Sequence, residues 1–294
     1  MKGPMNARKW LAVLLGLLFP PLVAAHAMEG EKEVDTQFIF GFTAGADVGE
    51  FGEKELEHQI IARSGKGEGT YAAFSDQLRA EFVPTRNFRF EVGVPVAFHN
   101  ISGVNDLDDR RHGRFDGVVT EFRYRLLDRE HAPFAFTIGA ESHWSRVDET
   151  SGEPVNNYGG ELLIAIDREF IKERVFGALN LVYDPEVTRS RETGLWQREA
   201  NLGIFASVTM QVRPGTFVGA EARYFRKYDT LGLDRFAGQA LFVGPTMYVR
   251  FSKTLAISGA WGIQAVGHAV EVPGSLDLTN FTHHQALFRL EYNF

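Results

Sequence analysis

Cysteine is absent from all 294 residues of the sequence. A chain without thiols has no disulfide framework, no thiolate nucleophile and no thiolate metal site. Positive charge is also scarce, because 31 Lys and Arg stand against 38 Asp and Glu, a formal net charge of −7. An acidic chain matches the phosphate backbone of nucleic acids poorly, so nucleic acid is not an expected partner.

Long apolar runs are missing after the first 27 residues, and no transmembrane helix is expected there. Aromatic residues and glycine are plentiful instead, with 25 Phe and 30 Gly. Aromatic side chains suit the girdles of membrane β-barrels, and glycine suits tight turns and close strand packing. The composition therefore favours an all-β chain over a soluble helical enzyme.

The first 27 residues read as a secretory signal peptide. Lys2, Arg8 and Lys9 supply its positive charge, and the apolar run Trp10–Val23 follows. This run is too short, and too soon interrupted by prolines, for a membrane anchor. Ala25-His26-Ala27 predicts cleavage after Ala27, with Ala25 as the alternative. Residues 28–52 are then expected to form a periplasmic or lumen-entering lead segment, and residues 53–294 the main domain.

The last strand has one apolar and one polar face, because side chains alternate across a strand. Its apolar face ends on a terminal aromatic residue and resembles the C-terminal signature of Gram-negative outer-membrane barrels. The predicted signal for the barrel-assembly machinery comprises Phe288, Leu290, Tyr292 and Phe294. In a closed membrane barrel this face would contact lipid, and no strand edge would stay unpaired.

Similar alternation recurs through the chain, clearest over residues 88–98. Short and long connections alternate along the chain. The short ones lie near residues 85, 130, 170, 214 and 253, and the one near 170 is a charged turn over residues 167–173; the longer ones include 100–114, 148–157 and 184–197. This alternation predicts a transmembrane up-and-down antiparallel β-barrel, with short periplasmic turns and longer outer loops. Twelve strands are expected, or fourteen if residues 38–42 form a strand. A soluble sandwich or lipocalin-like barrel would leave rows of Phe in water or bury the charged face.

The polar face of the strands should line the lumen. The predicted lumen-lining residues are Arg79, Glu81, Arg89, Glu91, Glu121, Arg123, Arg125, Glu141, His143, Glu161, Glu199, Glu221, Arg223, Arg250, Arg289 and Glu291. Arginine and glutamate nearly balance, whereas strongly ion-selective pores carry one sign in excess. These charges could cross-link the wall or orient a small solute, and both interpretations stay open. Phe176, Phe205, Phe217, Phe225 and Phe242 share the inward phase, which suits an aromatic or amphipathic solute.

An enzymatic alternative rests on Glu141, His143 and Ser145, which share one face of a strand. A serine hydrolase needs a hydrogen bond between serine and histidine, and residues i and i+2 lie about 6.5–7 Å apart. A lipid-cleaving site should also face lipid, and this face points inward. No enzyme activity, cofactor or metal site is therefore predicted. The acidic loop at Asp106–Asp109 lacks the spacing of a calcium loop.

Most of the chain after residue 51 resembles a family of proteobacterial outer-membrane barrels, some labelled as transporters of the phenol meta-degradation pathway. The resemblance rests on Gly52–Glu57, Tyr124–Asp128, Gly219–Tyr224, Phe242–Thr246 and the terminal strand. It implies a Gram-negative outer-membrane location among lipid and lipopolysaccharide. The expected function is a channel for passive passage of a small solute. A closed structural or adhesive barrel is the first alternative, and an outer-membrane lipid hydrolase the second.

Overall fold

The computed structural model describes residues 34–270 and 272–294. The predicted signal peptide, its cleavage site and residues 28–33 lie outside the described residues. Among the residues described, no helix is long and apolar enough to cross a membrane. The strands are β1 (Lys54–Ser64), β2 (Thr70–Thr85), β3 (Phe88–Ser102), β4 (Arg110–Phe115), β5 (Gly117–Leu127), β6 (Ala135–Val147), β7 (Pro154–Ile171), β8 (Val175–Ser190), β9 (Trp196–Arg213), β10 (Thr216–Tyr228), β11 (Phe236–Arg250), β12 (Leu255–Ala269) and β13 (His284–Asn293).

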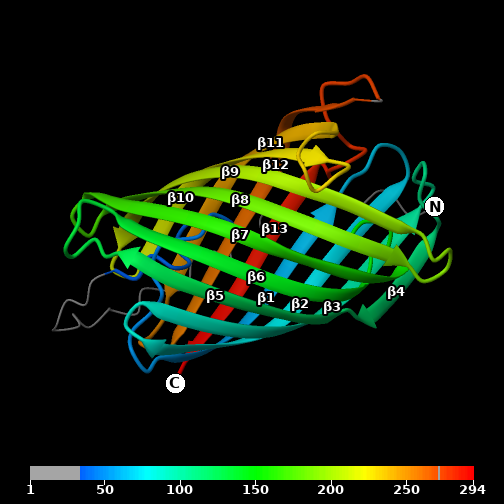
Figure 1. The fold of residues 1–294 in the computed structure, drawn as a ribbon. Coiled ribbons are helices and arrows are strands. Elements are labelled where there is room, and N and C mark those ends of the chain that lie inside the picture. The colour runs from blue at the N-terminus through cyan, green and yellow to red at the C-terminus, as the bar shows by residue number, and fades with distance from the viewer. Residues whose placement is uncertain (1–33, 271) are drawn as a thin grey trace, which may run out of the picture. The chain divides into compact units, whose positions relative to one another are not determined.

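The strands form one closed antiparallel barrel (Figure 1). Strand β13 pairs with β1, and β2 pairs with β3, so the sheet has no open side. Strands β4 and β5 are separated by Asp116 alone and both pair with β3, so they act as one interrupted strand. The 13 segments therefore make the predicted barrel of twelve strands. The fourteen-strand alternative is wrong, because residues 37–42 form turns instead of a strand.

Side-chain alternation separates an apolar exterior from a mixed interior. On β2, Phe74 and Leu78 are 42% and 57% exposed, whereas Ala73 and Glu81 are 3% and 6% exposed. The same contrast recurs around the barrel, where exposed Leu, Ile, Val and Phe side chains occupy the outer face. An exposed apolar band is costly in water and matches the hydrocarbon layer of a membrane.

Short turns gather at one end of the barrel, for example 172–174 and 214–215, and the longer loops at the other. We call the short-turn end periplasmic and the long-loop end outer, as the sequence predicts. Three outer loops are shorter than predicted. Strands β3, β7, β8 and β9 extend into the polar stretches, because a hairpin keeps its backbone hydrogen bonds whether or not its side chains are apolar.

Residues 34–48, which we call the lumen segment, run inside the barrel, visible as the blue trace in Figure 1. Two glycines permit this path. Gly41 has a φ of 83°, and a Cβ built on Gly45 would lie 2.0 Å from the Thr36 carbonyl oxygen. Side chains at these positions would strain or break the fold of the segment.

Candidate solute pathway

A row of glutamates crosses half of the inner wall at one level. We call it the carboxylate ladder: Glu55, Glu81, Glu91, Glu121, Glu141 and Glu161, one on each of β1, β2, β3, β5, β6 and β7. Each is directly opposite the next in the strand register. Directly opposed like charges destabilise a sheet, so this arrangement carries a cost that a purely structural wall could avoid.

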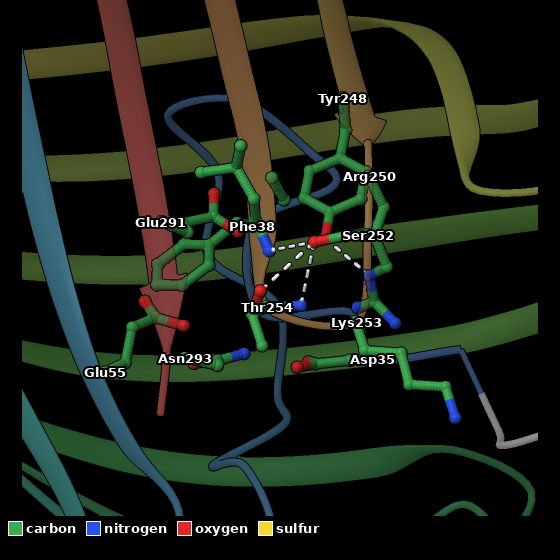
Figure 2. Close-up of a pocket in the computed structure, with 12 residues that line it drawn as sticks. Asp35, Phe38, Glu55, Tyr248, Arg250, Ser252, Lys253, Thr254, Glu291 and Asn293 are labelled. Atoms are coloured by element: carbon green, nitrogen blue, oxygen red, sulfur yellow. Dashed lines mark hydrogen bonds between the residues drawn. The ribbon is translucent and has the colours of Figure 1, made fainter.

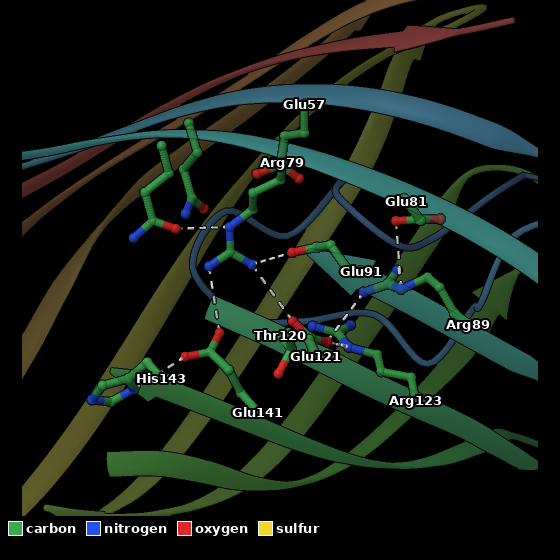
Figure 3. Close-up of polar contacts among 12 residues, drawn as sticks. Glu57, Arg79, Glu81, Arg89, Glu91, Thr120, Glu121, Arg123, Glu141 and His143 are labelled. Carbon is green, nitrogen blue, oxygen red and sulfur yellow. Dashed lines mark hydrogen bonds and ion pairs between the residues drawn. The ribbon is translucent and has the colours of Figure 1, made fainter. Parts of the chain in front are cut away.

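Three arginines pair with the ladder, and two of them, Arg79 and Arg89, join different glutamates (Figure 3). Arg79 contacts Glu91 and lies 3.4 Å from Glu141 Oε2. The Arg89 side chain, 1% exposed, lies 3.4 Å from Glu81 Oε2 and 3.2 Å from Glu121 Oε1. Arg123 also contacts Glu121 through its Nε. Six carboxyl groups thus face three guanidinium groups at this level of the wall.

The opposite wall is aromatic. Phe176, Phe205, Phe217, Phe242 and Tyr248 on β8–β11 are at most 8% exposed. Phe225 completes the wall, with its ring 5.0 Å from Phe205 and 6.0 Å from Phe242. Ring pairs at such separations stabilise beyond the area they bury. The overall balance of Arg and Glu therefore conceals two unlike walls, one rich in carboxylates and one rich in rings.

Arg223 is the cation of the aromatic wall. It is 3% exposed, and its guanidinium lies 3.7 Å from the centre of the Phe42 ring and 5.5 Å from that of Phe242. Its Nε lies 3.5 Å from Glu221 Oε1. Cation–π contacts of this kind strengthen when water is excluded. Glu221 offsets the charge of Arg223, so this wall presents rings more than net charge.

The lumen segment is fastened to the wall by hydrogen bonds from its own backbone. Glu221 Oε2 accepts from the Phe42 and Thr43 amides, both at 3.1 Å. Asn180 Oδ1 accepts from the Ala44 amide at 2.7 Å, and its Nδ2 donates to the Ala44 carbonyl at 2.9 Å. On the other side of the lumen, the Gln37 side chain donates to Glu81 at 2.7 Å. The segment thus bridges the aromatic wall and the carboxylate ladder.

An ion-pair cluster anchors both ends of the segment. Arg129, in the β5–β6 turn, lies 2.6 Å from Asp47 Oδ2 and 2.8 Å from Asp167 Oδ1. Asp167 Oδ2 accepts from the Ala46 amide at 2.7 Å, and Asp47 Oδ2 accepts from the Thr36 amide at 2.8 Å. One guanidinium thus joins two buried carboxylates and, through them, the start and end of the segment.

Sequence reasoning misses this anchor. The predicted charged turn over residues 167–173 is wrong at its start, because β7 continues to Ile171 and Asp167 is 1% exposed. Strand alternation could have indicated that Asp167 points into the barrel, because Asp167 falls on the same face as Leu163 and Ala165, which are both buried. Arg129 carried no such signal, because it lies in a turn.

The remaining predicted lumen residues lie toward the two ends. Arg289 lies 3.1 Å from Glu57 Oε1 and covers the Phe38 ring of the lumen segment at 4.4 Å. Arg125 lies 3.6 Å from Asp47 Oδ1. Toward the outer end, Glu199 lies 2.9 Å from Lys227 Nζ. It also borders an open recess of about 920 Å³ between residues 196–199 and 229–235.

The periplasmic end holds a small pocket of about 10 Å³ (Figure 2), enough for about one water molecule. Asp35, Glu55, Glu291 and Asn293 are among the residues that line it. Arg250 borders it as well and donates to the Tyr248 hydroxyl at 3.2 Å. The pocket is therefore a small polar recess beside the lumen segment, too small for a solute.

From the outer end, residues 276–283 of the last loop fold inward. Phe281 packs 5.9 Å from Phe225, and Gln264 donates to the Asp277 and Thr282 carbonyls at 3.1 Å each. Lys66 donates to the Thr279 carbonyl at 2.7 Å. Burial lowers the pKa of Lys66 from 10.5 to about 8, aided by the nearby Lys227. The loop and the lumen segment thus narrow the lumen from opposite ends.

His143 is oriented by carboxylates and not by serine. Its Nδ1 lies 3.6 Å from Glu141 Oε1, and its Nε2 lies 4.0 Å from Glu186 Oε1. Ser145 is paired in register with Asn157 across β6 and β7, as its neighbour His143 is with Gly159. This geometry gives serine no activated base.

The terminal strand closes the barrel. Phe288, Tyr292 and Phe294 are 44%, 49% and 67% exposed on the outer face, and Leu290 shares their phase. The Phe294 amide donates to the Lys54 carbonyl at 3.0 Å, so the last residue is tied to β1. Recognition of these four residues by the assembly machinery remains a prediction.

Three solved outer-membrane proteins resemble this chain to different degrees. The crystal structure of the COG4313 outer membrane channel from Pseudomonas putida F1 matches with a TM-score of 0.55 and 15% identity, over 89% of this chain and 100% of that one. The NanC porin matches with a TM-score of 0.48 and 11% identity, over 81% and 98%. The Pseudomonas putida toluene transporter TodX matches with a TM-score of 0.41 and 8% identity, over 90% and 98%.

At 15% identity, the likeness to the COG4313 structure establishes the fold alone, a closed antiparallel β-barrel. No curated protein matches the sequence. The label of the phenol meta-degradation pathway is not confirmed, because the family model that matches residues 32–294 is described as "Family of unknown function (DUF6662)". The match spans the whole barrel and the lumen segment, and the chain belongs to this family.

Proposed function

We propose that the protein is an outer-membrane channel that lets a small solute cross passively between the carboxylate ladder and the aromatic wall. The observation that carries the proposal is the ladder itself. Six directly opposed glutamates with three arginines are a costly way to fill a barrel, because well-packed apolar side chains are often as stable as buried ion pairs, or more so. A polar wall that contacts a solute would explain why the protein retains this energetic cost.

The two walls suggest the class of solute. An aromatic or amphipathic molecule can lay its apolar face on the rings of β8–β11 and direct its polar groups to the ladder. Carboxylates in excess attract cations and repel anions. We therefore expect neutral and cationic solutes to cross faster than anionic ones of the same size.

Passage requires the lumen segment to move. Its contacts reach β2, the β5–β6 turn, β8 and β10, on several sides of the lumen. These contacts are side-chain hydrogen bonds and the Arg129 ion pair, together with the packing of Phe38–Phe40 on the aromatic wall. Among the described residues, none of the segment's contacts is a backbone–backbone hydrogen bond to a strand. The segment is therefore a removable part of the interior, unlike the strands.

Replacing Glu161 by Gln should reduce the preference for cations and leave the barrel intact. Glu161 faces Glu141 in register and has no ion pair with an arginine among the described residues, so its loss breaks no cross-link. The measurement is the reversal potential of purified protein in planar bilayers under a salt gradient at pH 9, which favours the ionised form of the carboxyl groups, with liposome swelling by size-matched neutral, cationic and anionic solutes.

Asp106→Asn is the matched control, because it removes one carboxylate from an outer loop at a position whose φ of 62° Asn also tolerates. Cation preference that stayed unchanged in Glu161→Gln would remove the ladder from the pathway. Wild-type swelling rates equal to those of protein-free liposomes would favour the closed structural or adhesive barrel. Lipid hydrolysis abolished by Ser145→Ala would favour the hydrolase.

A further inference from the structure

Two ionisable side chains lie on the lipid-facing surface of the barrel. Along β1, Leu56 is 41% exposed and Glu57 is 3% exposed, so even-numbered residues of this strand point outward. His58 is therefore an outward residue. On β2, Asp76 shares the outward phase of Phe74 and Leu78. Ionisable residues are rare in the hydrocarbon layer and usually mark a function or a partner.

The two side chains pair with each other. His58 Nε2 lies 2.8 Å from Asp76 Oδ1, and both side chains are 39% exposed. Their neighbours in register are all apolar. Leu78 and Leu290 flank His58, and Ile60 and Val96 flank Asp76. The pair is thus an isolated polar spot within an apolar band.

The pairing leaves one polar atom of each of the two side chains without a hydrogen-bond partner among the described residues. These atoms are His58 Nδ1 and Asp76 Oδ2. Lipid tails offer neither donors nor acceptors, so unpaired polar atoms in contact with them are costly. A surface that displays one donor and one acceptor side by side is complementary to a copy of itself turned by a two-fold axis.

We infer that this outer face of β1 and β2 is an interface with a second copy of the chain. In the dimer, His58 carries a proton on both ring nitrogens: Nε2 donates to Asp76 of its own subunit and Nδ1 donates to Asp76 of the partner subunit, and the reciprocal bond forms by symmetry. The two unpaired polar atoms of each subunit would then be satisfied across the axis. Ala62 and Ala80, on the same outward face, leave room for close approach of two barrels.

The test is the oligomeric state of the purified chain, measured by native mass spectrometry in detergent and by cross-linking in lipid vesicles. We expect the wild type to be a dimer. His58→Leu/Asp76→Leu should weaken the dimer at least tenfold and keep the barrel folded, because leucine suits a lipid-facing site. Folding is checked by the heat-dependent shift in gel mobility.

Thr120→Val/Ser142→Ala is the matched control. It removes another outward polar pair, with Oγ atoms 2.9 Å apart on β5 and β6, and should leave the dimer unchanged. His58→Asp/Asp76→His retains self-complementarity and should restore dimerisation. A monomeric wild type in both detergent and vesicles, or a leucine variant as dimeric as the wild type, would overturn the inference. The proposed channel would stand in either case.

Discussion

Replacing Gly45 by Val should raise the single-channel conductance several-fold. A Cβ at this position would lie 2.0 Å from the Thr36 carbonyl oxygen and 2.5 Å from its carbon, both backbone atoms of the lumen segment. Neither can move without opening the turn that holds Thr36 beside Asp47. The lumen segment should therefore detach from the barrel wall, and water and ions should fill the part of the lumen that it occupied.

Arg129→Ala should act in the same direction by another route. It would leave Asp47 and Asp167 buried together without the guanidinium that joins them, and uncompensated buried charge is strongly destabilising. Gly259→Ala is the control, because a Cβ there meets only the Leu287 carbonyl oxygen, at an ordinary 3.5 Å. If Gly45→Val and Arg129→Ala both conducted like the wild type, the pathway of the solute would not run through the space that the lumen segment occupies.

Replacing Arg89 by Ala should cost roughly 3–5 kcal/mol of barrel stability. Arg89 is 1% exposed and holds Glu81 and Glu121, which lie on the strands on either side of it. Its removal leaves carboxylates buried with reduced compensation. The measurement is urea-induced unfolding in lipid vesicles, followed by the fluorescence of Trp144, Trp196 and Trp261.

Two further variants separate charge compensation from a general loss of arginine. Arg86→Ala removes an exposed arginine from the β2–β3 turn and should change stability little. Glu81→Gln/Arg89→Met removes one charge of each sign and should recover much of the loss. An Arg89→Ala variant within about 0.5 kcal/mol of the wild type would show that the ladder does not need this cross-link.

The barrel could be predicted from sequence because its signal is local. A period of two along each strand, with a turn after it, specifies which face is apolar without reference to the neighbouring strand. The number of strands was predicted by counting these alternating segments along the chain. The outer ends of β7, β8 and β9 were missed because their polar residues carry no burial signal, although their backbones still pair.

The carboxylate ladder could not be predicted, because it depends on register. The inward phase of Glu91 and Glu121 was evident from alternation, but their direct opposition follows from a strand alignment that a shift of two residues would abolish. The lumen segment was harder still. Phe38–Phe42 alternates like a strand, and only tertiary contacts, such as that of Phe42 with Arg223, show why it turns instead.

The most direct test is to lock the lumen segment in place. The Gln37 side chain of the segment donates to Glu81 Oε2 of β2 at 2.7 Å, so cysteines at these two positions lie within reach of a short bifunctional thiol reagent. The chain has no other cysteine that could react.

Planar-bilayer conductance of Gln37→Cys/Glu81→Cys, joined by a reagent that contains a central disulfide, is then recorded before and after reduction. Passage past a mobile lumen segment predicts a nearly silent cross-linked protein, which on reduction regains the conductance that the same variant had before cross-linking. Equal conductance in the two states, with the cross-link confirmed by mass spectrometry, would contradict it.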